Sequence, residues 1–395
     1  RAAARITTCE TSPGGNLAST SCRYPPSVMI GRFALLEALG DGGTATVWHA
    51  RDPLTGQPAA VKLLREELTR IPQQRRAFLA EARLAGRVTH PGVMHIIDCG
   101  EQERPGLPPQ AWLAMELLEG RSLAEEVRAH GPLSVTDALL LGEALLLALD
   151  AVHRAGLVHR DVTPANLMLR ITPGQPLDPG TVRLCDLGLA GPAGSTPAAG
   201  EPTGSFAALT AGHPAVPAFV WGSAPYLAPE HAAGHPVSAS ADLYQVGGVL
   251  HFALTGQAPF VRDGIEALLQ AHLAEPAEPP SSRRPEVPAA VDRLLLRALR
   301  KAPLERFDSA LDMYREVHAT RLALAENAVV TAPVPVIGAG IGAGIGVRAG
   351  AGAEPGALTG ARAPQGITAH PVPAATGAQR RRRVSGRRSE ERRVG

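Results

Sequence analysis

Apolar positions change their spacing partway along the chain. Over residues 33–61, short apolar runs alternate with Gly-rich and Pro-Leu-Thr-Gly turns, which predicts an antiparallel sheet. A helix is predicted over 78–88, and two further strands are predicted around 95–99 and 112–117, joined by the Pro-rich turn 104–109. From residue 133 onward the helix period dominates, over 133–155, 239–254, 264–274, 287–300 and 309–325. Strands followed by helices indicate an α+β fold with two unequal lobes.

The ends of the chain lack this patterning. The first Met that precedes dense patterned sequence is Met29, so residues 1–28 are interpreted as an unstructured leader or upstream read-through. A folded region is expected over 29–320. Residues 321–395 are rich in Ala, Gly and Pro, end in an Arg-rich stretch, and are predicted to be a disordered tail. The uncharged segment 328–347 is long enough for a membrane span, but its prolines and glycines disfavour a helix there.

The composition of the chain argues against some classes of protein function. The formal net charge is +2, and Arg and acidic residues are interspersed until the Arg-rich end, which argues against a nucleic-acid binder. Four cysteines without a C-x-x-C pair or zinc spacing fit a reducing compartment, so we expect a cytoplasmic protein. Of the 39 Lys and Arg residues, only Lys62 and Lys301 are lysine. A compact ammonium at Lys62 suits a site between two phosphates, whereas Lys301 is attributed to chance.

A Gly-rich turn is the first element with candidate chemistry. Gly40, Gly42 and Gly43 lie between two predicted strands, where glycines let backbone N–H groups approach phosphates. Such turns also join ordinary hairpins. The next predicted strand ends in Ala-Val-Lys at Lys62, and Glu81 on the following helix is placed to hold its ammonium. Taken singly, Lys62 and Glu81 would also fit a surface ion pair.

Two later segments carry acidic and amide groups. Asp161 in His-Arg-Asp can accept the proton of an incoming hydroxyl, and Asn166, five residues later, can offer its carbonyl oxygen to magnesium. Asp186, in Cys-Asp-Leu-Gly, supplies a further hard oxygen ligand.

These motifs, with Ala-Pro-Glu at 228–230, Asp242 and Arg306, occur in one order and at characteristic spacings. Over about residues 30–320 the chain resembles the eukaryotic-like serine/threonine protein kinases of bacteria. The resemblance implies a two-lobed protein kinase fold, with a small sheet lobe over 31–118 and a larger helical lobe over 119–320. It also implies that the γ-phosphate of ATP is transferred, with Mg²⁺, to Ser or Thr hydroxyls of proteins. Autophosphorylation is expected in the long segment 188–222.

The resemblance also implies residue roles. Lys62 would bind the α- and β-phosphates and pair with Glu81, Asp161 would be the catalytic base, and Asn166 and Asp186 would hold the metal. The adenine site would be formed by Val47, Ala60, the gatekeeper Met115, the hinge residues Glu116 to Leu118, and Met168. Glu230 with Arg306, and Asp242, would brace the larger lobe, and His159 would hold backbone under the Asp186 turn.

Three positions depart from the common pattern of the family. Ala45 replaces the third glycine, Leu187 replaces a Phe, and Thr163 stands where a Lys usually contacts the γ-phosphate. The Thr163 hydroxyl is expected to hydrogen-bond Asp161 or the phosphate, and the lost charge would cost ~1–4 kcal/mol if nothing compensates. A pseudokinase that only binds a nucleotide or a partner is therefore an alternative, and a small-molecule phosphotransferase is another. The sequence leaves open whether two copies form a homodimer.

Overall fold

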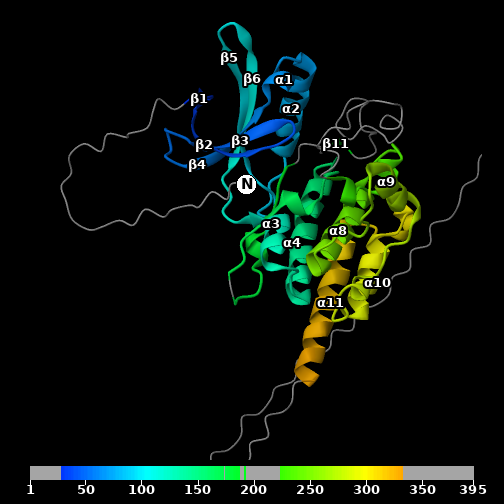
Figure 1. Cartoon of the computed structure of the whole chain (residues 1–395). Helices are drawn as coiled ribbons and strands as arrows, with labels where there is room; N and C mark the ends of the chain where they lie inside the picture. Colours follow the sequence, from blue (N-terminus) through cyan, green and yellow to red (C-terminus); the bar gives the residue numbers. More distant parts are fainter. Residues whose placement is uncertain (1–27, 173, 187–190, 193–222, 332–395) are drawn as a thin grey trace, which may run out of the picture. The chain divides into compact units, whose positions relative to one another are not determined.

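The computed structural model describes residues 28–172, 174–186, 191–192 and 223–331, and these belong to the first of two compact units, residues 1–333 (Figure 1). The predicted leader, Leu187, and almost all of the segment 188–222 lie outside the described residues. At the other end, helix α11 (Ala310–Thr331) continues past residue 320, where we predicted the folded region to end. The described helices include none long and apolar enough to cross a membrane, and most of 328–347 lies beyond them.

A six-stranded antiparallel sheet forms the first lobe, as predicted. Its order is β1-β2-β3-β4-β6-β5. The strands are β1 (Met29–Ile30), β2 (Phe33–Asp41), β3 (Ala45–Arg51), β4 (Pro58–Leu64), β5 (Ile96–Arg104) and β6 (Leu107–Glu116). Strands β5 and β6 extend into the segment we predicted as a Pro-rich turn, because Gly106, at φ 71°, reverses the chain within two residues. Phe33 and Trp112 meet edge to face in the core of this lobe, with ring centroids 5.9 Å apart.

Helices α1 (Glu66–Thr69) and α2 (Pro72–Ala85) pack beside the sheet. The predicted helix 78–88 therefore exists but begins earlier, because Pro72 occupies the first turn, where its missing N–H costs nothing. Leu79, Ala82 and Ala85 form the buried face of α2.

The second lobe is mainly helical. Its helices are α3 (Leu123–His130), α4 (Val135–Arg154), α7 (Pro229–Ala232), α8 (Ala239–Thr255), α9 (Ile265–Ala274), α10 (Ala289–Ala298) and α11. Short strands β7 (Arg121–Ser122), β9 (Leu167–Leu169) and β10 (Arg183–Leu184) form one sheet, and β8 (Leu157–Val158) pairs with β11 (Gly191–Pro192). Helix α3 was not predicted, although Ser122 and Glu125 form a capping box at its start. Helix α8 is buried along almost its whole length, so it forms the centre of this lobe.

Two predicted braces are present in this lobe. Arg306 and Glu230 form a buried bidentate ion pair, with both N–O distances 2.7 Å. Asp242 on α8 is fully buried, and its carboxylate accepts hydrogen bonds from the backbone N–H groups of His159 and Arg160 and contacts the His153 ring. Both predictions are confirmed, and Asp242 fixes the start of the segment that contains Asp161.

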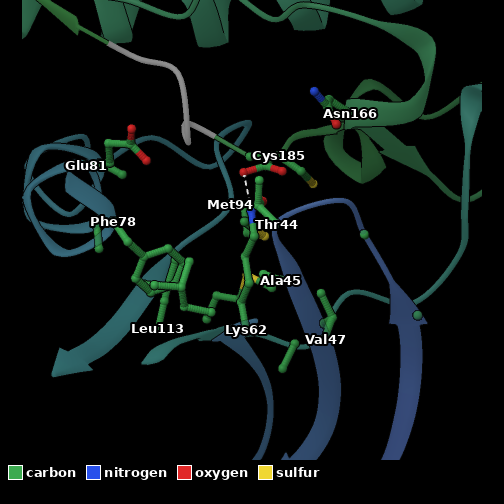
Figure 2. Close-up of a pocket in the computed structure, with 18 of the residues that line it drawn as sticks. Thr44, Ala45, Val47, Lys62, Phe78, Glu81, Met94, Leu113, Asn166 and Cys185 are labelled. Atoms are coloured by element: carbon green, nitrogen blue, oxygen red, sulfur yellow. Dashed lines mark hydrogen bonds and ion pairs between the residues drawn. The ribbon is translucent and has the colours of Figure 1, made fainter. Parts of the chain in front are cut away.

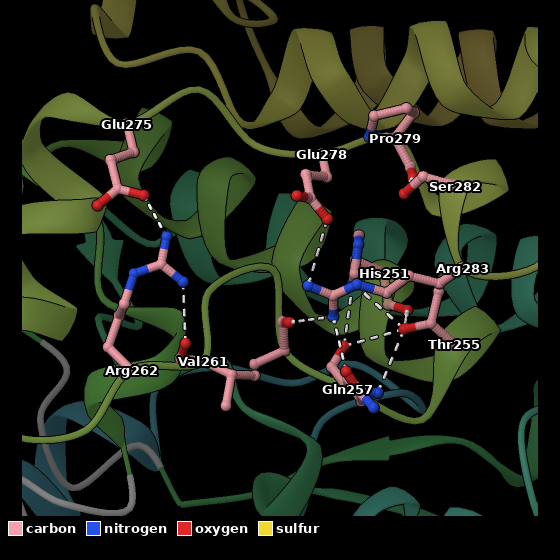
Figure 3. A network of polar contacts seen from close by, with 11 residues as sticks. His251, Thr255, Gln257, Val261, Arg262, Glu275, Glu278, Pro279, Ser282 and Arg283 are labelled. Atoms are coloured by element: carbon pink, nitrogen blue, oxygen red, sulfur yellow. Dashed lines mark hydrogen bonds and ion pairs between the residues drawn. The ribbon is translucent and has the colours of Figure 1, made fainter.

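A polar network holds the segment after α8, as Figure 3 shows. The Gln257 carbonyl accepts from Thr255 Oγ1 at 3.0 Å and contacts His251 Nδ1 at 2.9 Å, and Arg283 donates to the Gln257 side chain. Arg262 pairs with Glu275 nearby. These contacts fix the loop between α8 and α9.

Lys301, which we attributed to chance, has a specific environment. Its Nζ donates to the carbonyls of Ala271 and His272 at the end of α9, and it lies 4.4 Å from the centroid of the Phe260 ring. A positive charge at a helix C-terminus and over an aromatic face is favourable. The attribution to chance was therefore wrong.

Candidate nucleotide and catalytic site

One pocket of about 580 Å³ brings the predicted site residues together (Figure 2). Its wall comes from the β2–β3 turn, from β3, β4, α2 and β6, and from the segments around Asp161 and Asp186. The residues predicted for nucleotide or metal binding that line it are Gly40, Gly42, Gly43, Val47, Ala60, Lys62, Glu81, Met115, Glu116, Leu118, Asp161, Asn166, Met168 and Asp186. Residues far apart in the sequence thus share one cavity, which a set of unrelated surface motifs would not do.

The β2–β3 turn closes one side of the pocket. Gly42 N donates to the Ala45 carbonyl at 2.9 Å, and Ala45 is buried as the first residue of β3. Ala45 is not among the described non-glycine residues with positive φ, so an alanine is accommodated there without backbone strain. The replacement of the third glycine therefore leaves the turn intact.

An apolar slot leads into the pocket. Val47 on β3 and Ala60 on β4 lie on paired strands, and Ala60 is opposite Met115 on β6. The Glu116 backbone N–H donates to His95 O, and the Glu116 carboxylate accepts from His95 N, so the segment after Met115 is held from behind. Small and apolar walls suit a flat heteroaromatic ring.

The predicted ion pair between Lys62 and Glu81 is not formed. Lys62 Nζ instead lies 2.7 Å from Asp186 Oδ1 (Figure 2). Asp186 has a φ of 57°, a left-handed conformation that is uncommon outside glycine and that turns its carboxylate toward β4. Glu81 still lines the same pocket from α2, and Figure 2 shows its carboxylate well apart from the Lys62 ammonium. The ammonium is thus held by a carboxylate, but by a different one from that expected.

Asp161 is held with one oxygen available. Asn166 Nδ2 donates to Asp161 Oδ2 at 2.8 Å and to the Asp161 carbonyl at 2.9 Å. Asp161 Oδ1 is buried and has no hydrogen-bond partner within the described part of the chain. Burial raises the pKa of Asp161, and the neighbouring Asp186 carboxylate raises it further, whereas the Ser223 side chain, the His159 ring and the hydrogen bond from Asn166 oppose the rise. A carboxylate with a raised pKa is a better proton acceptor.

His159 and Thr163 flank this group. The His159 Nε2 lies 3.2 Å from the Cys185 carbonyl, which confirms that this histidine holds the backbone before Asp186. Thr163 is buried, but it is not among the residues that line the pocket. No hydrogen bond joins the Thr163 hydroxyl to Asp161 among the described residues, so that expected contact is not formed, and the contact with a phosphate stays a prediction.

Several pocket residues were not anticipated. Beyond Met115 the cavity continues to α2 along Phe78, Ala82, Met94, Leu113 and Cys185. Cys185 directly precedes Asp186 in the Cys-Asp-Leu-Gly motif, but no motif marks the other four residues, because their shared position depends on how α2 packs against the sheet. Burial raises the pKa of the Cys185 thiol to about 12, so the thiol is protonated at neutral pH.

The donor set fits a magnesium ion. The Asp186 carboxylate and the Asn166 side-chain oxygen are hard donors in the same pocket, and Asn166 directs its Nδ2 at Asp161, which leaves its oxygen for another partner. Across the described residues, no three His, Cys, Asp or Glu side chains are grouped to hold a metal ion. A bound ion would therefore share its remaining positions with phosphate oxygens and water.

Comparisons with known proteins agree with this geometry. The family described as "Protein kinase domain" matches residues 33–316. The chain belongs to this family. Similar proteins include the serine/threonine-protein kinase PknB of Mycolicibacterium smegmatis, 35% identical over 73% of this chain and 43% of PknB. PknA of Mycobacterium tuberculosis is 34% identical over 74% of this chain and 62% of PknA.

Solved structures show the same fold. The crystal structure of the PknI kinase domain of Mycobacterium tuberculosis matches with a TM-score of 0.54 and 26% identity, covering 75% of this chain and 98% of that domain. The chain covers 43% of the length of PknB and 62% of the length of PknA, so it spans only part of these curated relatives.

Proposed function

We propose that this chain is a serine/threonine protein kinase that transfers the γ-phosphate of ATP to hydroxyl groups of proteins. The observation that carries the proposal is the single pocket in which Lys62, Asp161, Asn166 and Asp186 meet beneath a glycine-rich turn. The family membership and the names of the similar bacterial kinases support the same activity.

Each residue has a distinct task in this mechanism. The Val47 and Ala60 walls orient the adenine, and the β2–β3 turn covers the phosphates with backbone N–H groups. The Lys62 ammonium, now 2.7 Å from Asp186, positions the phosphates from the side of β4. Asp161 Oδ1 receives the proton of the acceptor hydroxyl while Asn166 holds Oδ2.

Magnesium is the implied metal. When bound, it would neutralise charge on the phosphates, and Asp186 with the Asn166 side-chain oxygen would hold it. The sparse use of cysteine supports a cytoplasmic location. Autophosphorylation within 188–222 and the choice of protein rather than small-molecule acceptors are part of the proposal.

The test measures phosphate transfer and nucleotide binding on the same sample. The purified chain is incubated with Mg²⁺, labelled ATP and either a Ser/Thr-containing protein or a small amino sugar. We expect label on Ser and Thr of the protein and in 188–222, identified by peptide mass spectrometry. ATP binding without any transfer would identify a pseudokinase, and transfer only to the sugar would identify a small-molecule phosphotransferase.

A further inference from the structure

The side chain of Arg65 holds the glycine-rich turn from outside the pocket. Arg65 directly follows β4, and its Nε donates to the Gly42 carbonyl at 2.8 Å. Its backbone N–H donates to the Thr44 carbonyl at 2.9 Å. Since the turn consists of residues 42–44, two of its three carbonyls are fixed by this one residue.

Arg65 also faces the charge at the start of the turn. Its Nη2 lies 3.9 Å from Asp41 Oδ1, and the same oxygen accepts a hydrogen bond from Thr46 Oγ1 at 2.8 Å. Asp41 lines the pocket in which the phosphates are expected to bind. A guanidinium nearby offsets the repulsion that an acidic side chain would exert on an anionic ligand.

The backbone that carries Arg65 is itself anchored. The carbonyl of Leu64, the preceding residue, accepts from Thr69 Oγ1 at 3.1 Å and from Gln110 Nε2 at 2.6 Å, both buried bonds. Helix α1, which begins just after Arg65, is tied to β5 by the ion pair between Glu66 and Arg104 at 2.8 Å. The backbone on both sides of Arg65 is therefore held in place, so the guanidinium is attached to a well-ordered segment.

Glycine-rich backbone has many conformations available, and ordering it on ligand binding costs free energy. We propose that Arg65 is a positioning residue that preorganises the glycine-rich turn for the phosphates of ATP. The inference rests on the proposed function in one respect, namely that the pocket binds ATP. Arg65 does not line the pocket, so its effect is exerted through Gly42 and Asp41.

The chain offers closely matched variants. Arg65→Met keeps the apolar stem and the backbone N–H bond to Thr44 but removes the donor to Gly42. Arg65→Lys restores one donor of similar reach. Arg70→Met is the control, because Arg70 is an exposed arginine at the end of α1 whose guanidinium pairs only with the half-buried Glu66, at 3.7 Å, among the contacts of the described residues.

Isothermal titration calorimetry with Mg²⁺-ATP and with adenosine separates positioning from a general structural role. For Arg65→Met we expect the Kd for ATP to rise about tenfold, as for loss of one charge-assisted hydrogen bond, while the Kd for adenosine stays unchanged. Arg65→Lys should recover most of the ATP affinity, and Arg70→Met should behave like the normal chain. Thermal midpoints measured on the same samples show that the variants are folded.

Unchanged ATP affinity in Arg65→Met, or equal losses for ATP and adenosine, would overturn the inference. These outcomes are independent of phosphate transfer, because binding alone is measured. If the normal chain binds ATP but transfers no phosphate, the proposed function is overturned. The Arg65 inference is then still decided by the ratio of the Kd values for ATP of Arg65→Met and the normal chain. A normal chain that binds no ATP would overturn both.

Discussion

Removing the Arg306 guanidinium should destabilise the larger lobe severely. In Arg306→Met, the Glu230 carboxylate loses both of its 2.7 Å contacts and stays 9% exposed as an uncompensated charge. The carbonyls of Ser240, Arg300 and Lys301 lose a donor as well. Breaking a buried pair from one side typically costs about 3–5 kcal/mol, and the orphaned carbonyls place this site at the upper end of that range.

Urea unfolding followed by circular dichroism measures this loss as a lower midpoint at a similar slope. The matched control is Arg262→Met, because its pair with Glu275 has side chains 39% and 42% exposed, and it should change stability by less than about 1 kcal/mol. The double variant Arg306→Met with Glu230→Leu should lose less than Arg306→Met alone, since no buried charge remains. If Arg306→Met lost no more than the control, the argument from burial would be wrong.

Three further predictions concern other parts of the chain. Lys62→Arg should abolish measurable phosphate transfer, because a planar guanidinium does not fit between Asp186 and the phosphates. Lys301→Arg should keep the phosphate transfer activity of the normal chain. Equal activity of the two variants would count against the role of Lys62. Burial lowers the pKa values of His272 to about 3 and of His231 to about 4, so the folded state keeps both neutral while the unfolded chain binds protons below its ordinary value of 6.5. The contribution of these two histidines to the free energy of unfolding should therefore be fully present above about pH 7.5 and fall by roughly 4 kcal/mol in total between pH 7 and pH 5. His272→Gln should lose only about half as much stability over the same pH range. A pH profile of His272→Gln identical to that of the normal chain would contradict the assignment. Gly120→Ala should cost about 2 kcal/mol or more, because at φ 125° its Cβ would lie 2.3 Å from the Leu169 carbonyl oxygen, whereas Gly106→Ala meets open space and should cost less in the same thermal denaturation; equal losses would show that the contact is relieved by a small shift.

Periodicity and turn residues predicted the elements well. The antiparallel sheet and the helices α4, α8, α9 and α10 follow directly from the spacing of apolar positions. The predicted ends were less accurate where local chemistry decided them, as at Pro72, which starts α2 early, and Gly106, which shortens the hairpin turn.

The motifs predicted which residues share the site, but not every contact between them. The order of Lys62, Asp161, Asn166 and Asp186 indicated a shared cavity, and the structure places all four in one pocket. The partner of Lys62 was not predictable, because it depends on how far α2 lies from β4 and on the backbone turn at Asp186. A motif identifies the residues of an ion pair, but tertiary packing decides whether the pair forms.

Single residues without a motif were the hardest to interpret. Arg65 is one arginine among many, and only the contact of its Nε with Gly42 O separates it from a surface charge. Lys301 is one of two lysines, yet its role follows from the end of α9 and the Phe260 ring, which are distant from it in the sequence.

The central claim is that Asp161 accepts the proton of a protein hydroxyl in a pocket that binds ATP. Single-turnover transfer of labelled phosphate to a Ser/Thr protein, compared between the normal chain and Asp161→Asn with ATP affinity measured on both, tests it most directly. We expect Asp161→Asn to bind ATP with similar affinity and to transfer phosphate slower by about 10²- to 10⁴-fold. Equal transfer rates in the two proteins would remove Asp161 from the reaction and contradict the account.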